Sequence, residues 1–533
     1  MRFCLPAEPP EPGTVAIDGP LGHSRPLKIA AALAACLITA WLLLGSAQWS
    51  LTVHLRDEAA YLLALAATGD SPYRWRFRSS EDIVAGRVFG AGTATFSDDS
   101  LLIEAGAGAF DIGLPLRRML DLRRFPLLHI TMNRPEQQAE LRVVVREQLD
   151  AAERISAPLA LDPGSAVTTL DLGRLVWFDQ DRRVDAPRTA AMLRLRFSVG
   201  ASQRVRIEEV RLARLSDAQR VDLNAAPAAI VLPEDARARA AALQRVAQET
   251  DPRTTPLVRL SQRGSAETQI LSRNAILDRV PAAIVIPDSA YTESFAQARA
   301  QPRNDAEPAR APARWFFVAL YAVAAALVRL RPPRHVRLRA LCEILIAVAA
   351  PCWLILGGNY RGNADPWQVV AIACAIVFVL SLRTRAWQWR GSPRAWLLAL
   401  AVPAGALAIG LLGHHDGVPT REFGSWLFER YLVWALLQQY VLCVVCTERW
   451  LIVTGNSMLA VYFGALSFGV LHWPNAHLML ATFAGGLCWC SLYLRERALL
   501  PLAVSHTLSA LVLLALLPPE LLLNADVGVR FFQ

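Results

Sequence analysis

The sequence predicts a multi-pass α-helical membrane bundle that carries one large, mainly β domain outside the membrane. Hydrophobic residues make up 54% of the 533 residues and the mean hydropathy is +0.30, values typical of a membrane protein. Charged residues still contribute 19%, so a soluble part is expected as well. Apolar stretches long enough to cross a bilayer occur near the N-terminus and again after residue 312.

The first apolar stretch, residues 27–49, predicts a transmembrane anchor. It follows Arg25, carries no charge after Lys28 and is about as long as a helix that spans a bilayer. The apolar core of a signal peptide is shorter, roughly 7 to 15 residues. We therefore expect an uncleaved anchor that follows a cytoplasmic N-terminal tail, residues 1–26.

Residues 50–312 predict an extracytoplasmic region with a β-sandwich-like part at about 80–215. Runs such as AELRVVVREQL and AAMLRLRFSVG alternate apolar and polar residues with the period of half-buried strands. An antiparallel sandwich is expected, and a jelly roll of the carbohydrate-binding type is one candidate. The similar phrases at 226–233 and 280–287 predict strands or membrane-proximal contacts. The Pro-, Ala- and charge-rich residues 298–314 predict a linker.

Residues 313–533 predict a helical membrane domain of about eight spans, which with the anchor makes about nine. The expected spans are 315–330, 338–357, 367–383, 394–413, 425–446, 457–475, 477–494 and 498–517.

The arginine-rich segments 329–339, 383–394 and 495–497 fall in alternate loops, so the positive-inside rule makes these loops cytoplasmic. This parity places the N-terminus inside and residues 50–312 outside a cell (inner) membrane. No basic stripe with interleaved aromatic residues occurs, so a nucleic-acid partner is not expected.

The nine cysteines give two further expectations. None lies between residues 50 and 312, so the exported region must fold without disulfides. Cys443 with Cys446, and Cys488 with Cys490, have spacings that raise a four-thiolate metal site as an alternative. Packing of small cysteine side chains inside a helical bundle is the favoured interpretation.

Four polar residues inside the expected spans are candidate site residues: His472, His506, Gln438 and Gln439. Ionisable side chains within a membrane usually face the bundle interior or a water-filled cavity. A rise of about 1.5 Å per residue puts all four near the same depth. Buried packing residues joined by hydrogen bonds are the structural alternative for each of them.

The chemistry expected of this group is that of a bound metal or a polarised water. Imidazole is a common zinc ligand, so His472 and His506 are the expected ligands of a Zn²⁺ cofactor. A carboxylate that acts as general base is missing from the group. Glu448 is expected about ten residues, roughly 15 Å, further in, at the level of the lipid headgroups and paired with Arg449.

Phe468 and His472 form a Phe-x-x-x-His element, followed by WPNAHLMLATFAGGLCWCSLYLRERALLPLAVSH, which ends at His506. In this order of features, residues 425–518 resemble the CAAX prenyl protease type II and bacteriocin-processing family of intramembrane metalloproteases. The resemblance implies a helical membrane hydrolase that cleaves peptides, with His472 and His506 in its site.

The sequence departs from the family pattern at four positions. Gln438 and Gln439 stand where the family has paired glutamates, Cys443 where it has an arginine, and Ala510 where it has a final Asn. A glutamine amide forms hydrogen bonds but does not accept a proton from water at neutral pH. The general base of the family is therefore missing.

Two functions follow, of which the family resemblance favours the first, and a transporter or channel is a third and less favoured alternative. The first is an intramembrane metalloendopeptidase that cleaves a membrane protein or peptide, in which His472 and His506 bind or polarise and a glutamine orients water. The second is an inactive scaffold in the bilayer that presents the exported β domain to a glycan or protein ligand. The family resemblance favours an enzyme, whereas the missing carboxylate favours the scaffold.

Overall fold

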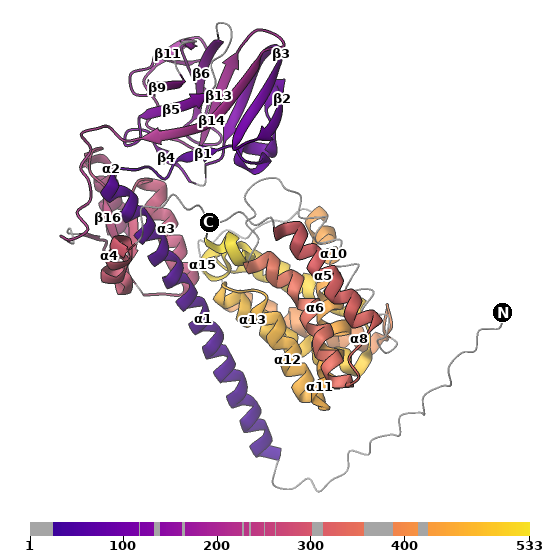
Figure 1. Cartoon of the computed structure of the whole chain (residues 1–533). Coiled ribbons are helices and arrows are strands. Elements are labelled where there is room, and N and C mark those ends of the chain that lie inside the picture. The colour runs from indigo at the N-terminus through magenta and orange to yellow at the C-terminus, as the bar shows by residue number, and fades with distance from the viewer. Residues whose placement is uncertain are drawn as a thin grey trace, which may run out of the picture.

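The computed structural model describes residues 25–116, 118–132, 139–161, 166–225, 229–233, 236–249, 251–261, 263–300, 313–356, 387–413 and 425–532. These residues form a β region, a small α/β unit and a helical bundle, and the long helix α1 (Arg25–Thr68) runs past the last two (Figure 1). The predicted tail before residue 25, most of the predicted linker and the predicted span 367–383 lie outside the described residues.

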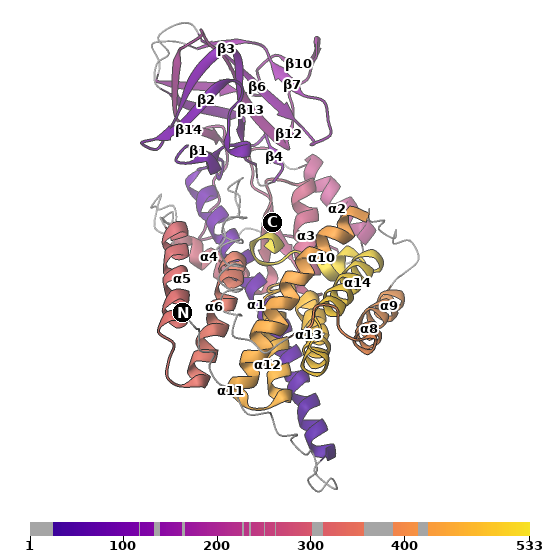
Figure 2. The same ribbon diagram turned by 90° about the vertical axis from the view of Figure 1, so that its right-hand side faces the viewer.

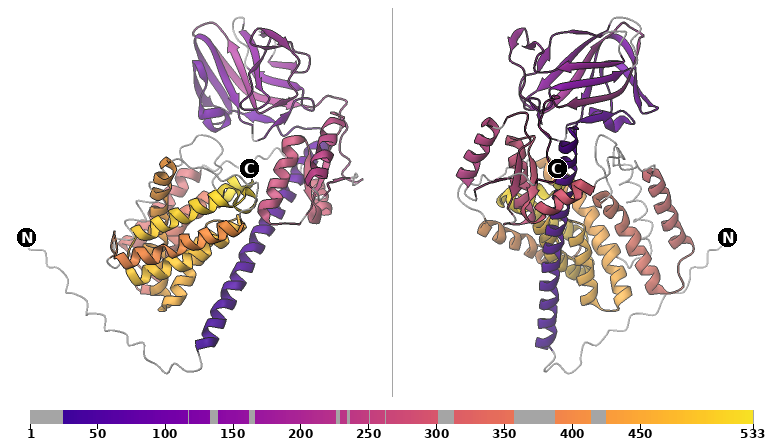
Figure 3. Two further views of the ribbon diagram at one scale, coloured as in Figure 1. Left: turned by 180° about the vertical axis from the view of Figure 1, so that it is seen from behind. Right: turned by 60° about the vertical axis from the view of Figure 1, so that its left-hand side comes forward.

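Helix α1 extends well beyond the predicted anchor, because its apolar face also has packing partners after residue 49. Leu43 and Ala47 pack against the bundle, whereas Leu51 and Leu55 pack in the core of the α/β unit. The charges at residues 56–58 end the hydropathic stretch without ending the helix. One uninterrupted helix therefore runs from the bundle to the α/β unit and the β region (Figure 3).

The β region confirms the prediction of a mainly β domain built from alternating strands. Its strands are β1 (Arg74–Arg76), β2 (Phe89–Ser97), β3 (Ser100–Leu114), β4 (Leu120–Asp121), β5 (Leu127–Met132), β6 (Ala139–Arg146), β7 (Arg154–Ser156), β8 (Leu159–Leu161), β9 (Val167–Asp171), β10 (Trp177–Asp179), β11 (Arg182–Val184), β12 (Thr189–Ala190), β13 (Met192–Ser198) and β14 (Arg204–Ala213). Twelve of them belong to one antiparallel sheet whose main path runs β11-β10-β7-β6-β13-β3-β14-β5-β9. Instead of two separate sheets, this path curls around a single core and forms a half-barrel.

The long strand β3 is what allows a single sheet to curl. Its N-terminal half pairs with β14 and its C-terminal half with β13, while β2 pairs along most of its length. The inward residues of these strands form the core, in which the rings of Phe110 and Phe197 stack with centroids 5.4 Å apart. Trp177 is fully buried and donates its indole N–H to the Leu172 carbonyl at 2.9 Å.

The α/β unit places the two similar phrases on strands, as predicted. Its order is β15 (Ile230–Val231), α2 (Ala236–Glu249), β16 (Leu257–Leu260), α3 (Ala266–Arg279), β17 (Ile284–Pro287) and α4 (Tyr291–Ala300). The three strands are parallel, and β16, which the sequence analysis did not predict, lies between the two similar phrases. Helix α1 packs on β17 and α4, so the apolar strands are covered.

The bundle confirms that the C-terminal region is helical and apolar. Its helices are α5 (Ala313–Leu330), α6 (Val336–Leu356), α8 (Pro393–Ala399), α9 (Ala401–Gly413), α10 (Ser425–Gln439), the π-helix η4 (Tyr440–Thr447), α11 (Glu448–Thr454), α12 (Ser457–Val470), α13 (Ala476–Glu496), α14 (Leu500–Leu516) and α15 (Pro519–Leu522). Within the described residues, four helical stretches are long and apolar enough to cross a membrane: 29–68, 393–413, 426–454 and 476–496. Three shorter apolar helices accompany them, and the count of about nine spans stays a prediction.

Small residues allow α12 and α13 to pack closely. A Cβ on Gly486 would lie 3.0 Å from the Cα of Ala465, and one on Gly469 would lie 3.1 Å from the carbonyl oxygen of Met479. Close backbone approach through small residues is the usual means of helix association in lipid. This crossing fixes the positions of the two helices on either side of His472.

The ion pairs of the bundle gather at its end far from the β region. Arg449 Nε lies 2.9 Å from Glu343 Oε2, and Arg339 Nε lies 3.0 Å from the other oxygen of the same carboxylate. Glu448 pairs with Arg497 instead of Arg449, so the predicted pair is wrong. Neighbouring residues on a helix point about 100° apart. Glu448 and Arg449 therefore pair with residues on different helices.

The described parts of the three arginine-rich segments lie at this same end of the bundle. The backbone N–H of Gln388 donates to the Arg497 carbonyl at 2.7 Å, which joins the second segment to the third. Arg339 belongs to the first segment and reaches Arg449 through Glu343. The opposite end faces the α/β unit (Figure 2).

Candidate functional site

Gln439 and His506 form the centre of the site. Gln439 is the last residue of α10 and is fully buried, and His506 lies in the first half of α14. The amide Nε2 of Gln439 lies 3.3 Å from Nδ1 of His506, and the thiol of Cys443 donates to its Oε1 at 3.3 Å. Both ends of the amide are therefore engaged by protein groups.

His472 lies in the turn that follows α12. The predicted span 457–475 had implied a position within a helix. Its Nδ1 lies 2.8 Å from the carbonyl of Phe468, so the neutral ring carries its proton on Nδ1 and keeps a lone pair on Nε2. The Phe468 ring contacts both histidines edge to face, with centroids 4.8 Å from His472 and 5.6 Å from His506. One aromatic ring thus joins the two imidazoles.

The surroundings of His506 are aromatic. The Trp489 ring lies 4.7 Å from the imidazole, and the Tyr431 ring lies 6.3 Å away, nearly perpendicular to it. Trp489 is held by its own indole N–H, which donates to Ser505 Oγ at 3.1 Å, and Ser505 in turn donates to the Ala399 carbonyl at 2.7 Å. The site is therefore a tightly packed, largely apolar chamber.

Of the four predicted residues, the structure brings His472, His506 and Gln439 together. Gln438 is half-buried and points about 100° away from Gln439 around the helix axis, so it does not share their contact. Gln439 and His506 lie in the helices α10 and α14, whereas His472 follows the end of α12 at Val470.

Sequence reasoning missed the π-helix that follows Gln439. Residues 440–447 form π-helical turns, in which the Thr447 hydroxyl donates to the Leu442 carbonyl five residues back, at 2.8 Å. Such segments are rare and occur often at functional sites. They have no residue signature that a single sequence displays, and here the π-helix contains Cys443, the residue that touches Gln439.

The donor set falls short of a catalytic zinc site. Such a site needs three protein ligands, and within the described chain no group of three or more His, Cys, Asp or Glu side chains is placed to hold a metal ion. The lone pair of His506 Nδ1 faces the Gln439 amide N–H, which leaves the ring proton on Nε2. The residues present do not fit the metal, and we derive no step through it.

The cysteines do not form a four-thiolate site either. Cys443, Cys446 and Cys490 are buried within the bundle, whereas Cys488 is exposed on the outside of α13. The Thr447 hydroxyl donates to the sulfur of Cys490 at 3.2 Å, a contact of the kind made by packed helices.

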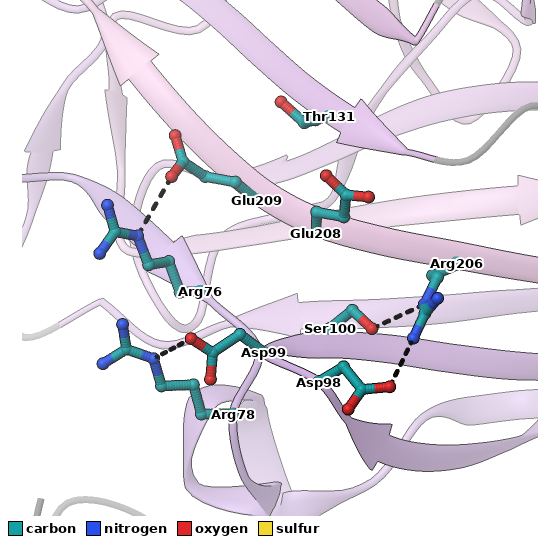
Figure 4. A pocket seen from close by; sticks show the side chains of 9 residues that line it. All are labelled: Arg76, Arg78, Asp98, Asp99, Ser100, Thr131, Arg206, Glu208 and Glu209. Atoms are coloured by element: carbon teal, nitrogen blue, oxygen red, sulfur yellow. Dashed lines mark hydrogen bonds and ion pairs between the residues drawn. The ribbon is translucent and has the colours of Figure 1, made fainter.

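The β region carries one polar hollow of about 420 Å³ (Figure 4). The hollow is lined by Arg76, Arg78, Asp98, Asp99, Ser100, Thr131, Arg206, Glu208 and Glu209. Three arginines are tied to neighbouring carboxylates, and Glu208 occupies a bulge of β14. None of these nine residues is aromatic, so the hollow offers no ring on which a sugar could stack.

Comparison with known proteins identifies one family. Residues 425–512, which run from α10 into α14, match the family described as type II CAAX prenyl endopeptidase Rce1-like. This match confirms the resemblance stated from the Phe468 and His472 element, and it contains every candidate site residue. It covers only the C-terminal part of the chain.

The other comparisons add little. No curated protein matches the chain. Among solved structures, the chain matches the CBM22-1-GH10 modules of Clostridium thermocellum endo-1,4-beta-D-xylanase 10B, complexed with xylohexaose. The identity is 11%, with 65% of this chain and 88% of that chain covered, and the TM-score of 0.18 is too low to support an argument.

Proposed function

We propose that this chain is a CAAX-protease-like membrane protein that binds a membrane-inserted peptide segment without cleaving it. In this proposal the bundle is a binding scaffold, and the exported β region meets a second partner, a glycan or a protein. The observation that carries the proposal is the Gln439 amide, held between His506 and Cys443 at the place where the resemblance to the family implies a glutamate.

With an amide at this place, two requirements of peptide hydrolysis are not met. The amide does not take a proton from water, and both of its polar ends are already bonded within the protein. His506 cannot replace the glutamate as a base toward water through Nδ1, since that lone pair faces the same amide. The rings of Phe468 and Trp489 pack against the His506 imidazole, with centroids 5.6 Å and 4.7 Å away.

The second candidate is the family's hydrolytic activity, an intramembrane metalloendopeptidase. It is favoured by one observation, the free Nε2 lone pair of His472 close to His506. The two candidates predict different results for peptide hydrolysis and zinc content of the purified protein, so these two measurements separate them.

The test uses full-length protein in proteoliposomes with quenched fluorescent transmembrane peptides as the probe. We expect no hydrolysis by the wild type, and no difference in zinc content between the wild type and the His472→Ala and His506→Ala variants. Wild-type hydrolysis that disappears in Gln439→Ala, or one zinc per chain that is lost in His472→Ala, would overturn the scaffold proposal. Hydrolysis measured with the Gln439→Glu variant then shows whether a restored carboxylate is sufficient for turnover.

We also propose that the bundle lies in the cell (inner) membrane with the β region outside the cytoplasm. The clustering of the arginine-rich segments at the end far from the β region supports this orientation. The exported region lacks cysteine, so Thr93→Cys, on the exposed face of β2, introduces a single thiol there. A membrane-impermeant maleimide added outside intact cells should label Thr93→Cys and leave the control Gln388→Cys at background.

A further inference from the structure

The segment that follows α14 folds back over the turn that carries His472. This segment, residues 519–532, is called the C-terminal strap here, and it consists of α15 and two 3-10 turns, η5 (Leu523–Ala525) and η6 (Gly528–Phe532). It lies between the bundle and the exported α/β unit (Figure 2). In the orientation proposed above, this position is on the outer side of the turn that carries His472.

The strap is hydrogen-bonded to the residues on either side of Pro474, which are Trp473 and Asn475. The backbone N–H of Gly528 donates to the Trp473 carbonyl at 2.9 Å. The side-chain amide of Asn475, which is fully buried, donates to the carbonyls of Leu522 at 2.7 Å and Asp526 at 3.1 Å. His472 is the residue next to this bonded turn.

The other side of the strap is held by the exported region. The Phe532 ring stacks on His54 of α1 with centroids 4.1 Å apart and contacts the Trp473 ring at 6.3 Å. The fully buried Arg273 of α3 donates to the Phe532 carbonyl at 3.2 Å. Phe531 is buried in the core shared by α1 and the α/β unit.

One carboxylate joins these contacts to the β region. Glu58 of α1 binds Arg273 through Oε2 at 2.5 Å and Arg118, in the β region, through Oε1 at 2.9 Å. A continuous set of bonds thus runs from Arg118 through Glu58 and Arg273 to the strap, and from the strap to the turn at Trp473.

A separate contact holds the α/β unit against the same turn. Glu267 in the first turn of α3 is fully buried, and its carboxylate lies 3.0 Å from Nδ1 of His477 and accepts from the His477 backbone N–H at 3.2 Å. Two independent attachments therefore hold the exported region over residues 471–477.

We propose that the C-terminal strap is a closed cover on the outer end of the histidine site, and that engagement of the exported region releases it. The proposal rests on the proposed function only in treating His472 and His506 as the ligand-binding centre. In its docked state the strap is bonded on one side to the turn at Trp473 and on the other side to α1 and α3 of the exported region. A ligand that disfavours the docked arrangement of Glu58, Arg273 and Phe532 would therefore open the site.

The first test is hydrogen exchange of the full-length protein in proteoliposomes. Phe532→Ala removes the ring contacts to His54 and Trp473 but keeps the carbonyl that Arg273 binds, so the fold is retained. We expect exchange in residues 471–478 and 519–532 to rise together, by about tenfold. The control is Phe96→Ala, a partly buried phenylalanine of the β region without a contact to the strap.

The two segments decide the outcome. A rise confined to residues 519–532, or an equal rise in Phe96→Ala, would overturn the cover, since the strap would then not protect the turn. Glu58→Gln gives a second variant that leaves every aromatic contact in place, and it should raise exchange in the same two segments.

The second test measures access to the site itself. A thiol in a His472→Cys variant should react with a membrane-impermeant maleimide from the outer side about tenfold faster when Phe532→Ala is added. An unchanged rate would overturn the cover. Neither readout depends on hydrolysis, so discovery of peptidase activity would refute the scaffold function and leave the cover intact.

Discussion

The ion pair between Glu343 and Arg449 provides a quantitative test of how α6 and α11 meet. The side chains are 8% and 3% exposed, and Arg449 Nε lies 2.9 Å from Glu343 Oε2. Removal of one partner from such a buried pair leaves a charge without its counterion and costs about 3–5 kcal/mol. Glu343→Met should therefore lower the free energy of unfolding by about that amount.

Substitution of Arg449 should lower the free energy of unfolding less than substitution of Glu343, because Glu343 has a second partner. In Arg449→Met the carboxylate still binds Arg339 Nε at 3.0 Å, at a position where the arginine is 26% exposed. The double variant removes both buried charges, and we expect it to be more stable than Glu343→Met alone. Replacement of whole buried ion pairs by apolar residues is often neutral.

The assay is reversible unfolding of full-length protein from mixed micelles by sodium dodecyl sulfate, followed by tryptophan fluorescence. The four proteins give a double-mutant cycle with its coupling energy. If Glu343→Met stayed within roughly 0.5 kcal/mol of the wild type, or if the two single costs simply added, the buried pair and the α6–α11 contact would be refuted.

Three other predictions concern neighbouring contacts. Ser505→Ala takes the acceptor from the buried Trp489 indole N–H and should lower the unfolding free energy by about 1–3 kcal/mol in the same assay. Gly486→Leu should destabilise the bundle more than Gly405→Leu, at a glycine with open space around it, because only Gly486 lies against another helix backbone. Burial disfavours ionisation of Glu267, but hydrogen bonds from His477, from its own backbone N–H and from Ser265 outweigh burial and lower its pKa below the usual 4.5. Ionised Glu267 therefore stabilises docked α3 above pH 4.5, and this stabilisation is lost as the pH falls through the lower folded pKa. Glu267→Gln should remove this loss in acid when hydrogen exchange of α3 is followed from about pH 7 to about pH 3.

Each of these three has a result that would count against it. An unchanged midpoint in Ser505→Ala would mean that water replaces the hydroxyl. Equal costs for the two glycine variants would mean that α12 and α13 do not meet at Gly486. Acid loss of α3 protection that persists in Glu267→Gln would assign the effect to another group.

The parts of the structure that the sequence predicted are those set by local pattern. Alternation placed strands β6 and β13, and hydropathy placed the helices of the bundle. A depth comparison predicted that the two glutamines, His472 and His506 lie near one level, because the rise of a regular helix is constant. These features depend on residues within one element.

The parts that the sequence did not predict depend on partners distant in the chain. The upper half of α1 is helical because Leu51 and Leu55 pack on an α/β unit more than 170 residues later, beginning at Ile230. The pairing of Glu448 with Arg497 depends on how helix ends meet. The π-helix after Gln439 and the fold-back of the strap likewise have no local signature.

In the membrane orientation proposed above, the uninterrupted helix α1 also sets the distance between the β region and the bilayer. Lys28 and Trp49 are 21 positions apart, a rise of about 32 Å, which matches the hydrocarbon thickness of a bilayer. Trp49 is 69% exposed and is the type of residue that sits at the lipid–water boundary. The remaining turns, to Thr68, add about 28 Å above that boundary. If α1 crosses the membrane as proposed above, the β region stands on a stalk beyond the lipid headgroups, within reach of molecules in the surrounding space and away from the membrane surface itself.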